Sequence, residues 1–362
     1  MDSLIDYVQW MSDIPIRATG FRDVDALVLS NLIYINLSSV FEEGSKEVYL
    51  KDCRKILDSG KVETAIAIRD DKYAELLRAT VDSVRFGELR ISDYVDIIRN
   101  DPPVQFAVVS FHDDDGLSFI SFRGTDDTLP GWYEDFITCY TVTEAQKMAR
   151  EYADRVIAAA PERRWIMGGH SKGGNLALYA GATMKSELFS HVTKIYDLDG
   201  PGLCPEVMEC PSIDRLLPLT TRIVPEFSVI GKVFDMDIPD TKIIKSFAKG
   251  LFQHAPISWG VDHGNIAAAA KNNPFSIWFN DFFANWIART NIDERKIFFS
   301  EVFEAINAGG ATNLEELADQ GIEGFFAIQN RLKNASDVTK RVMYDFTKQA
   351  FFSSIFPGQK TT

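Results

Sequence analysis

The fold of this chain is decided by one stretch of its sequence, Trp165-Ile166-Met167-Gly168-Gly169-His170-Ser171-Lys172-Gly173-Gly174-Asn175-Leu176-Ala177. The apolar residues at its start are typical of a short buried strand, and the residues at its end favour a helix. Between them lies the pattern Gly-x-Ser-x-Gly, which forms a sharp strand-to-helix turn when those two elements flank it. The stretch therefore predicts that Ser171 is a nucleophile at the start of a helix, where free N–H groups stabilise a developing oxyanion.

Two weaker interpretations of this stretch stay open on the sequence alone. Glycine and serine are common residues, so the five-residue pattern also fits a glycine-rich turn with a chance serine. A phosphate-binding loop fits less well, because the spacing G-x-x-x-x-G-K-[ST] is absent from the stretch.

Strand-like and helical segments alternate on both sides of the turn. Apolar runs typical of strands occupy residues 105–111, 117–122, 194–198 and 221–224, and helical periodicity follows residues 144–160 and 175–184. A turn signal of three aspartates and a glycine separates the first two runs, which predicts adjacent antiparallel strands. The alternation predicts an α/β fold, with a mostly parallel central sheet and helices on both faces.

We expect residues 1–362 to form a single unit. A catalytic core is predicted at residues 101–273, preceded by a helical N-terminal segment at residues 1–100. A helical C-terminal segment is predicted at residues 274–362, where residues 338–352 have the pattern of a final amphipathic helix.

Composition restricts the partners that the chain can have. A formal net charge of −14 over 362 residues argues against nucleic acid and anionic membranes. No apolar run approaches the roughly 18 residues of a membrane span, and the first residues lack the pattern of a signal peptide. The four cysteines lack metal-type spacing and are expected to be thiols, with Cys204 and Cys210 able to pair only if the protein is exported. We therefore expect a cytoplasmic enzyme with no nucleic-acid partner and no transmembrane segment.

Several motifs in the chain resemble those of class 3 lipases, which belong to the α/β-hydrolase superfamily. Residues 122–125 (Phe-Arg-Gly-Thr) and 131–136 resemble their "FRG[ST]…W…D" segment, and residues 168–174 resemble their "GHSLGG" turn. The nearest likeness is to a bacterial family of uncharacterised lipase-like hydrolases with the motifs "GHSKGGNLA", "DGPG" and "QH…SW". These motifs correspond to residues 169–177, 199–202 and 253–259. The resemblance covers residues 105–261 and implies an α/β-hydrolase fold.

The resemblance also implies an oxyanion hole and a lid. Thr125 corresponds to the oxyanion-hole residue of class 3 lipases, and its backbone N–H would act together with that of Lys172. A helix-capping or turn role for Thr125 is the alternative. Class 3 lipases have leucine where this chain has Lys172, so the ammonium either shapes substrate preference or reaches solvent. Residues 125–136 occupy the lid position, so that Trp132 and Tyr133 either cover the site or pack on it.

The general base is expected after the serine and the acid in chain order. Of the five histidines, His112 comes before Ser171 in the chain, and His191 closely follows the predicted helix. His170 lies inside the turn and is expected to support the turn. His254 and His263 remain. His254 is favoured because it matches the late motif of the family that the chain resembles.

The acid is predicted to be Asp199. Class 3 lipases place the aspartate one strand later, before a Val-Pro, but this chain has Arg222 at that position. Asp199 ends a predicted strand, at the sheet edge where α/β enzymes place their sites. The alternative is that Asp199 only caps the turn at Gly200. Glu226 and Asp237 are the fallback acids.

The expected activity is hydrolysis of a small-molecule carboxylic ester or related acyl compound by Ser171, His254 and Asp199. No cofactor is expected. No metal is expected either, because the aspartate runs lack the spacing of a calcium loop and no histidine–cysteine cluster suggests zinc. Acyl transfer or thioester hydrolysis would use the same groups. A non-catalytic binding protein on a hydrolase scaffold is the alternative from another class.

Overall fold

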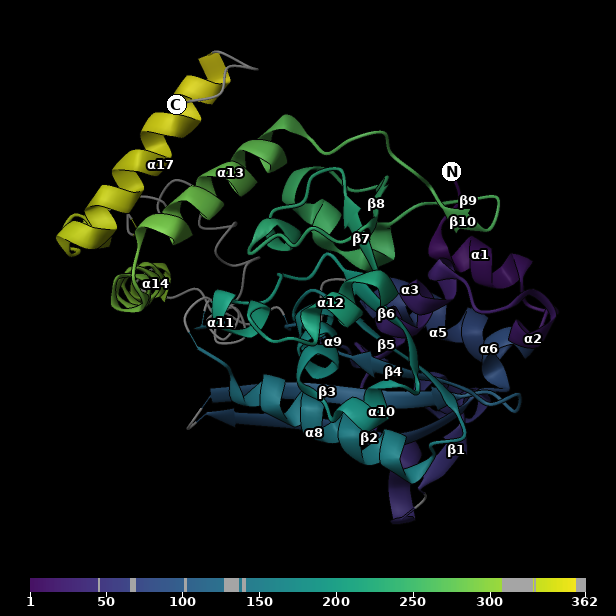
Figure 1. Cartoon of the computed structure of the whole chain (residues 1–362). Coiled ribbons are helices and arrows are strands. Elements are labelled where there is room, and N and C mark those ends of the chain that lie inside the picture. Colours follow the sequence, from purple (N-terminus) through teal and green to yellow (C-terminus); the bar gives the residue numbers. More distant parts are fainter. Residues whose placement is uncertain are drawn as a thin grey trace.

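A computed structural model of the chain describes residues 1–44, 46–65, 70–100, 103–126, 137–138, 141–307, 328 and 330–355. Its centre is an eight-stranded sheet in which every strand lies beside its neighbours in sequence, in the order β1 to β8 (Figure 1). The strands are β1 (Glu47–Tyr49), β2 (Arg90–Asn100), β3 (Pro103–His112), β4 (Leu117–Phe122), β5 (Arg164–His170), β6 (Val192–Leu198), β7 (Thr220–Pro225) and β8 (Asp240–Ile244).

The sheet changes direction at β4. The strands β1 to β4 pair antiparallel, and β4 to β8 pair parallel. The predicted antiparallel pair is β3 and β4, whose turn is closed by the Asp113 carboxylate as it accepts the backbone N–H of Leu117 at 2.7 Å. From β4 to β7 the connections contain α-helices, as is usual between parallel strands, whereas the connection from β7 to β8 contains only the short 3-10 helix Ile230–Lys232.

Helices cover both faces of the sheet, and side chains of successive strand residues point to opposite faces. On one face, Trp165 and Met167 of β5 pack with α8 (Glu144–Ala159) and α9 (Lys172–Thr183) in one buried cluster. On the other, Ile166 packs with α1 (Leu4–Trp10), α3 (Asp23–Leu32) and α5 (Asp70–Val81) in a second cluster. This architecture, with the serine turn between β5 and α9, confirms the predicted α/β-hydrolase fold.

The N-terminal segment contains more strand than the sequence suggested. Residues 1–100 were expected to be helical, but β1 and β2 extend the sheet within them, and residue 100 falls at the end of β2. The strand β2 lies near the sheet edge, and its second half exposes Asp96, Ile98 and Arg99. A strand with charged residues among the apolar ones lacks the continuous apolar run of a central strand, which explains why the pattern was missed.

The C-terminal helices α13 (Pro274–Arg289), α14 (Ile292–Asn307) and α17 (Asp337–Ile355) pack around an aromatic cluster that includes Phe283, Trp286 and Phe299. Figure 1 shows them at the end of the sheet where β7 and β8 lie, far from β1. Helix α17 contains the amphipathic segment expected at residues 338–352. Among the described residues, no helix is long and apolar enough to cross a membrane.

Candidate active site

The turn between β5 and α9 holds Ser171 in a conformation that L-residues rarely adopt. Ser171 has φ 58° and ψ −129°, and backbone of this kind costs about 1–3 kcal/mol. The two flanking glycines are required sterically, because a Cβ on Gly169 or Gly173 would collide with the carbonyl oxygen of Phe122 in β4. The turn is therefore pressed against the neighbouring strand. This geometry fits the strained serine turn expected from the sequence and not a loose glycine-rich loop.

The structure brings the three sequence-predicted residues Ser171, His254 and Asp199 into one chain of contacts. The Nε2 atom of His254 lies 3.0 Å from the Ser171 hydroxyl, and its Nδ1 atom lies 2.7 Å from a carboxylate oxygen of Asp199. Because an ionised carboxylate only accepts, Nδ1 of His254 carries the hydrogen, and Nε2 of the neutral ring accepts from the Ser171 hydroxyl. The ring is thus oriented to take a proton from Ser171.

Asp199 is fixed by the strands around it. It directly follows β6, has φ 53°, and its backbone N–H donates to the carbonyl of Ile223 in β7 at 2.8 Å. Its side chain is fully buried, and the carboxylate oxygen that faces away from His254 accepts the hydroxyl of Ser228 at 2.5 Å. A Cβ on Gly231 would collide with the same oxygen. Asp199 therefore has little freedom to turn away from His254.

Arg222, at the position where class 3 lipases carry their acid, pairs instead with a second buried aspartate. Its guanidinium lies 3.1 Å from the carboxylate of Asp197, and both side chains are almost completely buried. Burial raises the pKa of Asp197 to about 6, while Arg222 acts in the opposite direction. The other Asp197 oxygen accepts the backbone N–H of Gly200 at 2.8 Å. The pair thus braces the turn that follows Asp199.

The segment after β4 runs beside the serine. A Cβ added to Gly124 would lie 3.1 Å from the Cβ of Ser171, so the backbone leading to Thr125 passes close to the Ser171 side chain. Arg123 anchors this segment through two hydrogen bonds to Asp96 of β2, at 2.8 and 2.9 Å. Thr125 is buried, and Lys172 begins α9 directly after Ser171. Both backbone positions predicted for an oxyanion hole therefore flank the serine.

A sequence model of the Mbeg1-like family matches residues 80–304, more than half of the chain. This chain belongs to the Mbeg1-like family. No curated protein matches it.

Among solved structures, the Mbeg1-like chain is similar to fungal lipases. A fungal lipase–inhibitor complex is 15% identical, with 61% of this chain and 77% of that chain covered and a TM-score of 0.37. The Rhizomucor miehei lipase propeptide complex is 15% identical, with 60% and 66% covered and a TM-score of 0.37. Lip2 lipase from Yarrowia lipolytica is 14% identical, with 52% and 73% covered and a TM-score of 0.32. Likenesses this distant say nothing about activity.

Other predicted residues of this Mbeg1-like chain fall in different places. Trp132 and Tyr133, expected in a lid, lie outside the described residues, as does most of the segment 125–136. The side chain of Lys172 is buried, with only 2% of the residue exposed, so it does not reach solvent. His263, the alternative base, is exposed and contacts Asp262. The fallback acid Asp237 is also exposed. Because Asp199 already contacts Nδ1 of His254, neither Asp237 nor Glu226 occupies that contact.

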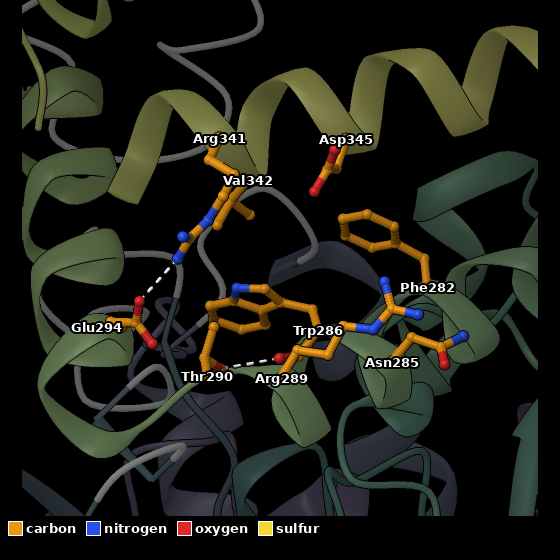
Figure 2. Close-up of a pocket in the computed structure, with 9 residues that line it drawn as sticks. All are labelled: Phe282, Asn285, Trp286, Arg289, Thr290, Glu294, Arg341, Val342 and Asp345. Carbon is orange, nitrogen blue, oxygen red and sulfur yellow. Dashed lines mark hydrogen bonds and ion pairs between the residues drawn. The ribbon is translucent and has the colours of Figure 1, made fainter. Parts of the chain in front are cut away.

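A hollow of about 330 Å³ lies among the C-terminal helices (Figure 2). Trp286 of α13 forms its floor, and Arg341 of α17 crosses it to pair with Glu294 of α14 at 2.7 Å. None of its lining residues belongs to the serine turn or to the loop of His254. It is a separate feature of the helical segment. In the described residues no group of three histidine, cysteine or carboxylate side chains is arranged to hold a metal ion.

Two side chains beside the site were not singled out as functional in the sequence. Ser228, which holds Asp199, follows β7 in a stretch without motif character. Tyr34 lies far from the motifs in sequence, yet its hydroxyl is 2.8 Å from the ring of His170. A buried tyrosine at the end of an apolar helix looks like core, so only a three-dimensional structure reveals this contact.

Proposed function

We propose that this Mbeg1-like protein is a serine hydrolase that cleaves small-molecule carboxylic esters without a cofactor. The observation that carries the proposal is the contact chain Asp199–His254–Ser171 on a strained strand-to-helix turn. Each of its two contacts is at hydrogen-bond distance, with Asp199 buried and the His254 side chain 21% exposed. A site of this kind has both a base within reach of the nucleophile and an opening toward solvent.

The chemistry follows from the direction of these hydrogen bonds. The Ser171 oxygen attacks the ester carbonyl carbon while its proton passes to Nε2 of His254, and the carbonyl oxygen becomes an oxyanion. The backbone N–H groups of Thr125 and Lys172 stabilise that charge; one such donor typically contributes about 10²–10³ in rate. The imidazolium then protonates the leaving alcohol, and the acyl group stays on Ser171. Water then attacks the acyl carbon as it gives a proton to His254, and His254 passes that proton to the Ser171 oxygen as the acid leaves.

Asp199 has two roles in this scheme. It keeps the hydrogen of His254 on Nδ1, so that Nε2 remains free to accept from Ser171. It also stabilises the imidazolium once the proton has moved. Both roles need a carboxylate that stays in place, and the buried contacts of Asp199 with Ser228 and with the backbone of β7 supply that.

The proposal is tested with the full-length protein, a fluorophosphonate probe and a series of p-nitrophenyl esters of graded acyl length. The expected result is stoichiometric labelling of Ser171, located by peptide mass spectrometry, and turnover of at least one ester. Absence of labelling in the native protein would overturn the proposal in favour of a binding protein on a hydrolase scaffold.

We further propose that the protein acts in the cytoplasm. The four cysteines lack the regular pairing of a disulfide framework, which supports a reducing compartment. Cell fractionation with an antibody to the native chain tests this location, and recovery in the exported fraction would contradict it.

A further inference from the structure

His170, the residue directly before Ser171, binds the backbone of the loop that carries His254. Its Nε2 atom lies 2.7 Å from the carbonyl oxygen of His254, and its Nδ1 atom lies 2.8 Å from the hydroxyl oxygen of Tyr34. A carbonyl oxygen only accepts, so Nε2 of His170 carries the hydrogen and Nδ1 of the neutral ring is an acceptor. The Tyr34 hydroxyl must then donate to it. The two contacts together select one tautomer of His170.

The surroundings of His170 keep the ring neutral. It is buried, and this burial, with the nearby His254 as a second cause, holds the pKa of His170 well below its usual value. The centres of the two imidazole rings are 4.5 Å apart. His170 therefore cannot serve as a second proton acceptor for Ser171. What it can do is hold the main chain of His254.

The loop of His254 depends on such anchors. The preceding 3-10 helix, Gly250–His254, contains Leu251 and Phe252, which are 65% and 66% exposed. Because these side chains bury little apolar surface, packing alone fixes the loop weakly. Its main chain accepts three side-chain hydrogen bonds: from His170 at the carbonyl of His254, from the Trp259 indole at the carbonyl of Gln253, 2.7 Å away, and from the Ser258 hydroxyl at the carbonyl of Ala255, 2.6 Å away.

Tyr34 comes from the N-terminal helical segment and is rigidly held there. It is 1% exposed, and its own carbonyl accepts the backbone N–H of Ala65 at 2.8 Å. Its hydroxyl lies directly over Gly124, where any Cβ would collide with it. The glycine of the Phe-Arg-Gly-Thr motif thus leaves room for the Tyr34 hydroxyl as well as for the serine turn.

We propose that Tyr34 and His170 are positioning residues that hold the main chain of His254 and so keep its imidazole against Ser171. The proposal rests on the proposed hydrolase function, but neither residue touches the reacting atoms. Tyr34 also lies outside residues 80–304, the part matched by the family. The N-terminal segment is therefore part of the catalytic unit and not an independent cap.

The test compares two buried tyrosines that each lose only a hydroxyl. Tyr34→Phe removes the donor to His170 and keeps the ring. Tyr152→Phe is the matched control, because its hydroxyl is also buried and bonded, to Ser110 at 2.9 Å, within the core. We expect Tyr34→Phe to lower kcat for a p-nitrophenyl ester about tenfold with KM within about twofold, since small misplacements of catalytic groups are costly. Tyr152→Phe should leave both constants unchanged even if its Tm falls.

A second pair of variants separates positioning from simple stability. His170→Gln retains an amide N–H near the Nε2 position, whereas His170→Leu retains none. The glutamine variant should keep several times more activity than the leucine variant at equal folded fraction. Equal kcat in wild type and Tyr34→Phe, or equal losses in Tyr34→Phe and Tyr152→Phe, would overturn the proposal.

Amide hydrogen exchange distinguishes failure of this proposal from failure of the hydrolase function. If wild-type protein is not labelled by fluorophosphonate, the hydrolase function fails, but exchange at residues 250–256 still reports on the loop. Faster exchange there in Tyr34→Phe than in Tyr152→Phe would support the positioning contact without any turnover. Identical exchange would overturn it.

Discussion

Among the described residues, two serine hydroxyls lie at almost the same distance from Nε2 of a histidine, one pair at the candidate site and one in the core. Ser171 lies 3.0 Å from Nε2 of His254, and Ser92 of β2 lies 2.9 Å from Nε2 of His112 at the end of β3. Distance alone would give both pairs the same chemistry. The difference between them lies in the direction of the serine–histidine hydrogen bond, which a neighbouring carboxylate sets in each pair.

The carboxylate contacts the histidine in one pair and the serine in the other. Nδ1 of His254 donates to the Asp199 carboxylate, so Nε2 accepts from Ser171. At the other pair, the Ser92 hydroxyl donates to Asp93 at 2.7 Å, so Ser92 can only accept from Nε2 of His112. Nδ1 of His112 then accepts from Ser118, 2.8 Å away. A serine that receives a hydrogen from its histidine is not activated by it.

Burial and charge strengthen this contrast. Burial lowers the pKa of His112 to about 4, with Arg163 as a second cause. His112 is therefore a poor base near neutral pH. Ser92 lies in an extended strand with no following helix, so no oxyanion site accompanies it. The pair on the turn thus has a carboxylate behind its histidine and lies at the start of a helix, whereas the pair in the core has neither.

The largest effect expected from this comparison is the loss of activity in Ser171→Ala. Removal of the nucleophile should lower kcat by more than about 10⁴, because loss of a triad member usually costs orders of magnitude. Ser92→Ala, the matched control, should stay within about twofold of wild type. Ester hydrolysis and fluorophosphonate labelling measure both. More than about a tenth of wild-type activity in Ser171→Ala would remove Ser171 from the role.

The next effect in size concerns the carboxylate. Asp199→Asn should fold and yet lower kcat by about 10³–10⁴, because an amide at this position favours the wrong tautomer of His254. Glu226→Gln and Asp237→Asn are the controls, and both should remain near wild type. Steady-state kinetics on the three purified variants measure the effect. A large loss in either control with a normal Asp199→Asn would transfer the role of acid.

The smallest effect is a change in stability at the other pair. In the unfolded chain, His112 becomes protonated below its usual pKa of 6.5. In the folded chain it stays neutral down to about pH 4. The protonation of His112 in the unfolded chain therefore lowers the free energy of unfolding by on the order of 2 kcal/mol between pH 7 and pH 5. His112→Gln should reduce that pH dependence, measured by denaturant unfolding at both pH values. An unchanged slope would show that His112 does not titrate in this way.

The sequence predicted those parts of the site that carry a local signal. Ser171 has two required glycines around it, Asp199 directly follows a strand, and His254 follows both in chain order within a recognisable late motif. Tyr34 and Ser228 carry no such signal, because a buried tyrosine or a serine after a strand is ordinary in any core. The strand β2 was missed for a related reason, since the charged residues of a strand near the edge hide its alternation.

The order of the strands has a consequence for how the protein is made. Because each strand lies beside the one synthesised just before it, the sheet can grow from β1 to β8 as the chain leaves the ribosome, without waiting for a distant partner. Ser171 and Asp199 are in place once β7 has been added, but the chain must still be extended to His254. The segment that follows His254 is in turn held by the N-terminal residues, because Asp2 and Val261 exchange two backbone hydrogen bonds at 2.8 Å. In the proposed scheme, Ser171 therefore lacks its base until the chain has been extended past His254.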